Sequence, residues 1–246
     1  MQRKTLYIHL GTHRTATSSI QEYLHSNFDA LVAQGVLYPL GVRRHVHLVN
    51  NLFSGRRNPL ELAHDLLQRA ESKPTAIHSI ILSDEDIAMR RNLSIFAQMQ
   101  EVFDVKFVYC LRRQDIWLES WYMQNVKWQW DKTLAHITFP EFCNRISDFH
   151  WIDYDNYLSH LESLVGKENV ITYVFERRDM PRGPVQAFAD LVGIDSRNLP
   201  PPPHSNASFS PLLVEFSRRL PMEKAPPALR KKHSPTHRGS TPWPTR

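Results

Sequence analysis

The chain has 246 residues, of which 41% are hydrophobic, so it can bury one α/β core with a small accessory region. Its net charge of +5 suits an anionic ligand, but the basic residues are scattered and form no stripe of the kind that nucleic acid requires. Two cysteines make no disulfide framework, and the sequence shows neither a membrane-length apolar run nor a signal-peptide core. We therefore expect a cytoplasmic protein without a nucleic-acid partner or a membrane span.

Strands and helices alternate along the chain, which predicts an α/β fold with a mainly parallel sheet flanked by helices. The expected strands are 5–10, 77–82, 105–111 and 170–175. The expected helices are 17–33, 59–71, 93–103, 115–129, 139–147, 154–165, 185–192 and 211–220. Residues 36–58 read as a loop, and 221–246 as a disordered tail rich in proline and basic residues. A single domain is thus expected over 1–220.

The first strand runs into a glycine, and a loop rich in hydroxyl groups then leads into a helix. The loop and first helical turn consist of Gly11, Thr12, His13, Arg14, Thr15, Ala16, Thr17, Ser18 and Ser19. Unpaired N–H groups at a helix N-terminus attract an anion, so this segment predicts a phosphate-bearing ligand. An ordinary strand-to-helix connection rich in Ser and Thr is the alternative.

The register of this loop separates two kinds of phosphate ligand. Aligned on Gly11, a nucleotide-triphosphate loop of the form G-x-x-x-x-G-K-[ST] would have glycine at 16, lysine at 17 and a hydroxyl residue at 18. Ser18 fits and Ala16 is a small substitute, but Thr17 removes the lysine. Such a loop holds a magnesium nucleotide poorly and can still cradle a metal-free phosphate.

The segment from His9 to Gln21 resembles the 5'-phosphosulfate-binding motif of sulfotransferases that use 3'-phosphoadenosine 5'-phosphosulfate (PAPS). Arg14 stands where that motif carries its basic residue, whereas Ala16 departs from its usual glycine. The resemblance implies a P-loop NTPase-like three-layer sandwich and PAPS as the co-substrate.

A second motif follows the strand 105–111, which ends at Arg112, with Ser120 eight residues later in the next helix. In a doubly wound sheet both would face the crevice beyond the strand ends, where a guanidinium and a hydroxyl suit a second phosphate. The pair resembles the 3'-phosphate motif of the same family. Taken alone, it could be a surface arginine and an incidental helix serine.

The later part of the chain also resembles this family. Segments 170–176 and 185–194 are similar to a strand-plus-helix unit in the second half of many sulfotransferases. Segment 204–211 looks like a short polar segment that is expected near the cofactor in bacterial members. Asn206 and Ser208 are therefore candidates for binding, although solvated loop residues are the alternative.

The resemblance implies sulfuryl transfer, with Arg14 and the loop stabilising the leaving group and a carboxylate acting as base. The family's S-x-E pattern after the second strand matches Ser83-Asp84-Glu85, so Glu85 is the candidate base and Asp84 its rival. These carboxylates could instead cap the following helix. His13 is a third possible base, whereas His9 is expected in the core.

Other clusters point to no further chemistry. Four tryptophans, Trp117, Trp121, Trp128 and Trp130, could stack on a sugar ring or simply pack in a core. The basic run 43–47 lacks carboxylates or cysteines at ligand spacing, which argues against a metal site and favours a solvated charge run.

The expected acceptor is a hydroxyl or amine group of a small molecule or glycan. Of these, a carbohydrate is the substrate that we expect most. One alternative is a nucleotide kinase or NTPase with a degenerate loop, in which Asp84 would hold magnesium. The other is a non-catalytic module that binds a bisphosphonucleotide.

Overall fold

The computed structural model describes residues 3–202, 210–221 and 224. The binding candidates Asn206 and Ser208, and nearly all of the predicted tail, lie outside these residues. The chain groups into two compact units, and each is described separately. The first contains residues 1–113 and 149–203, and the second contains 114–148 and 204–246.

The first unit is built on a five-stranded sheet whose paired strands all run parallel, in the order β2-β3-β1-β4-β5. The strands are β1 (Thr5–Gly11), β2 (Val36–Leu37), β3 (Ser79–Ser83), β4 (Asp104–Leu111) and β5 (Val170–Val174). Every residue of β3 is buried, as expected for a central parallel strand that is covered on both faces. The α/β class and the four predicted strands are confirmed; the short edge strand β2 was not predicted.

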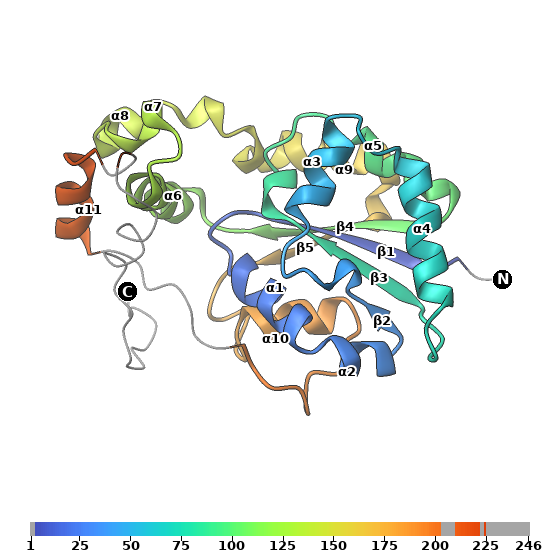
Figure 1. Cartoon of the computed structure of the whole chain (residues 1–246). Coiled ribbons are helices and arrows are strands. Elements are labelled where there is room, and N and C mark those ends of the chain that lie inside the picture. Colours follow the sequence, from blue (N-terminus) through green and yellow to red (C-terminus); the bar gives the residue numbers. More distant parts are fainter. Residues whose placement is uncertain (1–2, 203–209, 222–223, 225–246) are drawn as a thin grey trace. The chain divides into compact units, whose positions relative to one another are not determined.

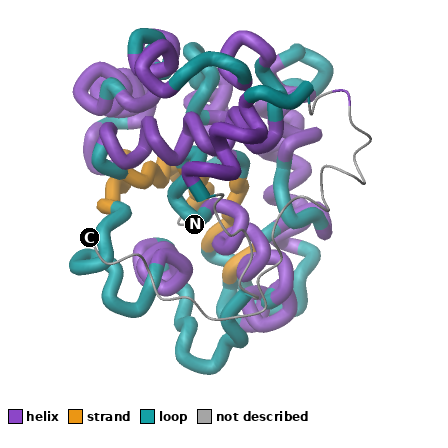
Figure 2. The backbone as a smooth tube through the Cα atoms, turned by 90° about the vertical axis from the view of Figure 1, so that its left-hand side faces the viewer, coloured by secondary structure: helices purple, strands orange, loops and turns teal. Residues whose placement is uncertain are grey.

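Helices cover both faces of this sheet (Figures 1 and 2). One face carries α1 (Thr17–Ser26), α2 (Phe28–Ala33) and α10 (Pro184–Leu191), and the other carries α3 (Val46–Phe53), α4 (Pro59–Glu71), α5 (Ser94–Ala97) and α9 (Tyr154–Val165). Side chains such as Ile20, Tyr23 and Phe188 join α1 and α10 to Ile81 and Val108 of the sheet in one buried cluster. This packing holds α1 against the sheet.

Short 3-10 helices complete the chain: η1 (Pro39–Gly41), η2 (Glu85–Ile87), η3 (Gln98–Glu101), η4 (Ile146–Asp148), η5 (His150–Ile152) and η6 (Lys167–Asn169). Local signals set the start of α4, because the Asn58 side chain accepts hydrogen bonds from the N–H groups of Leu60 and Glu61, with Pro59 between. No helix in the described ranges is both long and apolar enough to cross a membrane.

Several predicted elements differ from those in the structure. The helix expected over 93–103 is instead α5 followed by η3, and the helix expected over 139–147 ends at Cys143, before η4. The helix expected over 17–33 is broken at Asn27, whose side-chain amide donates to Tyr23 O (2.9 Å) and to Pro200 O (3.3 Å). The second contact comes from a distant segment, so helical periodicity does not reveal it. The loop expected over 36–58 contains β2 and α3.

The second unit consists of α6 (Gln114–Trp128), α7 (Lys132–Ala135), α8 (Phe139–Cys143), η4 and α11 (Pro211–Arg218). The amide of Gln129 donates to the carbonyls of Ser217 (3.0 Å) and Leu220 (2.9 Å). His136 Nδ1 lies 2.7 Å from Arg218 O. These bonds attach α11 to the chain between α6 and α8.

Candidate functional site

The predicted site residues of the first unit lie at the ends of β3, β1 and β4, which are neighbours in the sheet. After β1 the chain enters α1 on one face of the sheet, and after β3 it passes to α5 on the opposite face (Figure 1). Connections that leave adjacent parallel strands in opposite directions open a crevice beyond the strand ends, where α/β sheets bind ligands. The loop 12–16 and the acidic run 84–86 both begin at this point.

The loop after β1 has an unusual backbone that leads into an uncapped helix. Gly11 (φ +86°), Arg14 (φ +68°) and Ala16 (φ +61°) all have left-handed conformations. Ala16 is the N-cap of α1, but no side chain caps this helix end. The first-turn N–H groups of an α-helix have no partner within the helix, so this end of α1 can receive an anion.

Ala16 and Gly11 occupy positions that favour glycine for different reasons. At Ala16 the left-handed backbone explains why the resembling motif carries glycine there, and alanine accepts a strain of about 1–2 kcal/mol. At Gly11 a Cβ atom would lie 2.9 Å from Thr17 Cγ2 and 3.2 Å from Glu85 Cβ. The acidic run is therefore packed directly against the loop.

The loop hydroxyls divide into buried and accessible groups. Thr15 is fully buried and donates to Thr12 O (2.6 Å), while the buried Thr12 hydroxyl has no hydrogen-bond partner in the described part of the chain. Thr17 is also buried, whereas Ser18 and Ser19 in the first turn of α1 are half-buried. Thr15 thus shapes the loop, and Ser18 and Ser19 are the hydroxyls best exposed to a ligand.

Two guanidinium groups meet at this loop. Arg112 Nη1 donates to Arg14 O (2.5 Å), which brings the end of β4 against the loop. Burial, together with the positive charge of Arg112, lowers the pKa of Arg14 to about 10. Tyr154 holds the Arg112 backbone, since its hydroxyl donates to Arg112 O (2.5 Å) and accepts from Arg112 N–H (3.1 Å). An anion bound beside these two guanidinium groups would be attracted by both positive charges.

The structure brings Arg112 to the loop but leaves its predicted partner untested. Ser120 is half-buried in α6, which belongs to the second unit. The pairing of Arg112 with Ser120 stays a prediction.

The acidic run after β3 surrounds an arginine from the supposed loop 36–58. Arg44 Nη2 lies 2.7 Å from Asp84 Oδ1 and 2.6 Å from Asp86 Oδ2, and its Nη1 lies 3.4 Å from Glu85 Oε1. Although burial lowers the pKa of Arg44, these three carboxylates raise it overall. The solvated charge run expected at 43–47 is therefore, at Arg44, a half-buried set of ion pairs.

The three carboxylates have different surroundings. Asp84 is fully buried, caps η2 by accepting from Asp86 N–H (2.8 Å), and has its pKa raised by burial. Burial acts to raise the pKa of Asp86, but His13 and Arg44 lower it overall, with His13 Nε2 only 2.9 Å from Asp86 Oδ1. Glu85 accepts from Gln21 Nε2 (2.6 Å) of α1. Capping of η2 therefore accounts for the position of the Asp84 carboxylate but not for that of the Glu85 carboxylate.

His9 lies behind the loop as a core residue, which confirms the expectation. It is fully buried, its Nδ1 lies 2.8 Å from Ser83 Oγ, and it packs against the ring of Phe188. Burial lowers the pKa of His9 to about 3.

Comparisons with known proteins bear on the fold. A crystal structure of a sulfotransferase from Alicyclobacillus acidocaldarius matches with a TM-score of 0.50 and 16% sequence identity, over 87% of this chain and 89% of that one. The fold is that of a sulfotransferase. No protein-family model and no curated protein matches the sequence. The predicted resemblance is confirmed for the fold, including its parallel sheet flanked by helices.

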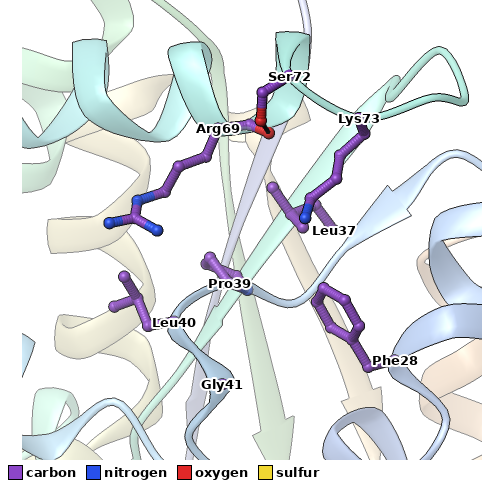
Figure 3. Close-up of a pocket in the computed structure, with 8 residues that line it drawn as sticks. All are labelled: Phe28, Leu37, Pro39, Leu40, Gly41, Arg69, Ser72 and Lys73. Atoms are coloured by element: carbon purple, nitrogen blue, oxygen red, sulfur yellow. Dashed lines mark hydrogen bonds between the residues drawn. The ribbon is translucent and has the colours of Figure 1, made fainter.

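A separate hollow lies at the outer edge of the sheet of this sulfotransferase fold (Figure 3). It has a volume of about 300 Å³ and an apolar floor that includes Phe28 and Leu37, with Arg69 and Lys73 of the α4 end above it. None of the predicted site residues lines it.

Arg44 and Gln21, whose side chains contact the Glu85 carboxylate, were not predicted from the sequence. Gln21 had a weak signal, because it lies one helical turn beyond Thr17 on the helix that follows the phosphate loop. Arg44 had none, since 40 residues separate it from Asp84 and the two segments come together only in the folded chain, through the pairing of β2 with β3 and the bonds of His45 to Ser83.

Proposed function

We propose that this protein is a PAPS-dependent sulfotransferase that transfers a sulfuryl group to a hydroxyl or amine acceptor, with a carbohydrate as the acceptor. The observation that carries the proposal is the pair Arg14 and Arg112 at the uncapped N-terminus of α1, on a loop without the nucleotide-triphosphate lysine. The similarity to a sulfotransferase structure supports it at the level of fold. A single domain over 1–220 is part of the proposal.

The residues present fit the PAPS anion. Bound there, PAPS would supply an activated sulfuryl group on its 5'-phosphate. We assign the 5'-phosphosulfate to the segment from Gly11 to Ser19, where amide groups, Ser18, Ser19 and the Arg14 guanidinium gather. Arg112 and Ser120 are assigned to the 3'-phosphate. A dianion would offset the burial and the repulsion from Arg112 that together lower the pKa of Arg14.

The reaction requires the chain to stabilise the leaving group and to accept a proton, and different residues suit these two roles. As the acceptor oxygen or nitrogen bonds to sulfur, the bond from sulfur to the bridging phosphate oxygen breaks and its electron pair stays on that oxygen. Arg14 and the N-terminus of α1 stabilise this developing charge. Glu85 receives the proton of the acceptor, because it lies against Gly11 of the phosphate loop while Asp84 is a buried cap.

The contacts of Arg44 argue against the kinase or NTPase alternative. In that alternative Asp84 would hold magnesium, but its Oδ1 instead accepts hydrogen bonds from the Arg44 guanidinium at 2.7 and 3.2 Å. Asp86 Oδ2 also lies 2.6 Å from the same arginine. A guanidinium therefore occupies the position between these carboxylates that a metal ion would need.

Two finer parts of the proposal depend on other residues. A carbohydrate acceptor is favoured by Trp128 and Trp130, whose rings stack at 5.8 Å between centroids, with Trp130 61% exposed. A cytoplasmic location is favoured by Cys110 and Cys143, which are both free thiols.

Ligand binding tests the proposal without knowledge of the acceptor. We expect adenosine 3',5'-bisphosphate to raise the melting temperature in the presence of EDTA, and ATP with magnesium to have a smaller effect. Arg14→Met should weaken bisphosphate binding by about 10- to 100-fold, since hydrogen bonds to charged groups contribute about 1.5–3 kcal/mol. Arg57→Lys, on a surface ion pair with Asp65, is the control.

Two outcomes would redirect the proposal. A magnesium-dependent response to ATP alone would favour the kinase. Glu85→Gln separates an enzyme from a non-catalytic module, because it should spare bisphosphate binding and abolish turnover of PAPS only if Glu85 is the base.

A further inference from the structure

Glu85 is held through both of its carboxylate oxygens by residues that have no assigned role. Gln21 Nε2 of α1 donates to Oε2 (2.6 Å), and Arg44 Nη1 lies 3.4 Å from Oε1. Gln21 is fully buried, and Glu85 is 7% exposed. The carboxylate is thus oriented from two sides by elements that are far apart in the sequence.

The segment that carries Arg44 is itself fixed to the end of β3. The hydroxyl of Tyr38 donates to Arg43 O (2.7 Å), and His45 Nε2 lies 3.0 Å from Pro39 O. His45 Nδ1 accepts from Ser83 N–H (3.1 Å), so His45 Nε2 carries the proton and donates to Pro39 O. These bonds pin both ends of the turn before Arg44, and they join it to the residue just before the acidic run.

Arg44 also offsets the negative charge of the run 84–86, close to where an anion is expected to bind. The run 84–86 presents three carboxylates beside a loop proposed to bind a phosphosulfate. A guanidinium presents several N–H donors in a rigid planar fork, so one Arg44 side chain can contact all three carboxylates at once. A lysine in its place would keep the charge but not this geometry.

We infer that Arg44 and Gln21 are positioning residues, which orient the Glu85 carboxylate toward the acceptor and leave nucleotide binding to the phosphate loop, Arg112 and Ser120. The inference rests on the proposed function. In this inference Arg44 and Gln21 contact neither substrate, and they affect the reaction only by orienting Glu85. Because misplacement of a reacting group by about 1 Å can cost about 100-fold in rate, the predicted effect is on kcat.

The experiment compares Arg44→Lys and Gln21→Asn with wild type, with Arg57→Lys as the matched arginine control. Isothermal titration measures the Kd of adenosine 3',5'-bisphosphate, and we expect it to change by less than about twofold in all variants. Release of that product from PAPS, with N-acetylglucosamine as the probe acceptor, should show kcat reduced by about 10- to 100-fold in the first two variants only. The KM for PAPS should stay near the wild-type value.

A second measurement does not depend on the acceptor. The carboxyl ¹³C resonance of Glu85, assigned by its loss in Glu85→Gln, should move in Arg44→Lys and Gln21→Asn and stay in place in Arg57→Lys. An unmoved signal would overturn the inference, and so would a loss of bisphosphate affinity equal to the loss of kcat. Failure of wild type to bind the bisphosphate would instead refute the proposed function, and the resonance would still decide whether the two residues orient Glu85.

Discussion

Replacement of Gly11 by alanine tests the packing of the acidic run against the phosphate loop. Gly11 has φ +86°, and an added Cβ would lie 2.9 Å from Thr17 Cγ2 and 3.2 Å from Glu85 Cβ. The variant therefore meets both backbone strain and a steric clash. Gly55→Ala is a matched control, because Gly55 has φ +71° and no atom within 4 Å of the added Cβ.

Gly11→Ala and Gly55→Ala share the strain of a left-handed backbone, and only Gly11→Ala adds a steric clash. A left-handed backbone costs an alanine about 1–2 kcal/mol, partly offset by about 0.4–1 kcal/mol because alanine restricts the unfolded chain. Overpacking a buried position adds about 1–3 kcal/mol, and only Gly11→Ala meets it. We therefore expect Gly11→Ala to lower the free energy of unfolding by about 1–3 kcal/mol more than Gly55→Ala.

Urea denaturation of both variants measures this difference, and titration with adenosine 3',5'-bisphosphate measures its effect on the site. We expect Gly11→Ala to weaken binding as the loop shifts, and Gly55→Ala to bind as wild type does. Equal losses of stability in the two variants would refute the close packing of Gly11 against Thr17 and Glu85.

Three further predictions follow from the loop, the core and a helix end. Ala16→Gly should raise the free energy of unfolding by up to about 1 kcal/mol in urea denaturation, because it removes left-handed strain; a clear loss would contradict that backbone. The pKa of His9 is about 3 in the fold against 6.5 in the unfolded chain, so its stabilisation is present above pH 6.5 and is lost as pH falls. Between pH 7.5 and 5.5 the wild type should lose about 1.4 kcal/mol more than His9→Asn in denaturant titrations, and equal losses would show that His9 is not buried in its neutral form. Asn58→Ala should destabilise the protein by about 1 kcal/mol in thermal unfolding, and no change would contradict its role as a helix cap.

Local signals were enough to predict most of the fold. The apolar runs gave four of the five strands, and Asn58 with Pro59 gave the start of α4, because these features act within a few residues of sequence. The two-residue strand β2 carries too little pattern to be recognised. The break at Asn27 depends on a bond to Pro200, which is formed only in the folded chain.

The site residues that come directly after a strand could be predicted from the sequence. The phosphate loop, Glu85 and Arg112 each come directly after a buried strand, and the structure brings Arg112 to Arg14 and Glu85 to Gly11. Arg44 could not be predicted in this way, because its partners lie 40 residues ahead and its own segment has no periodicity. The sequence also could not reveal that His13 pairs with Asp86.

A crystal structure of the complex with adenosine 3',5'-bisphosphate, grown without metal, would show directly where the nucleotide binds. We expect the 5'-phosphate to lie against the first-turn N–H groups of α1, with the Arg14 guanidinium in contact and Arg112 on the 3'-phosphate. A nucleotide bound away from this loop, or one whose phosphates contact neither arginine, would contradict this expectation.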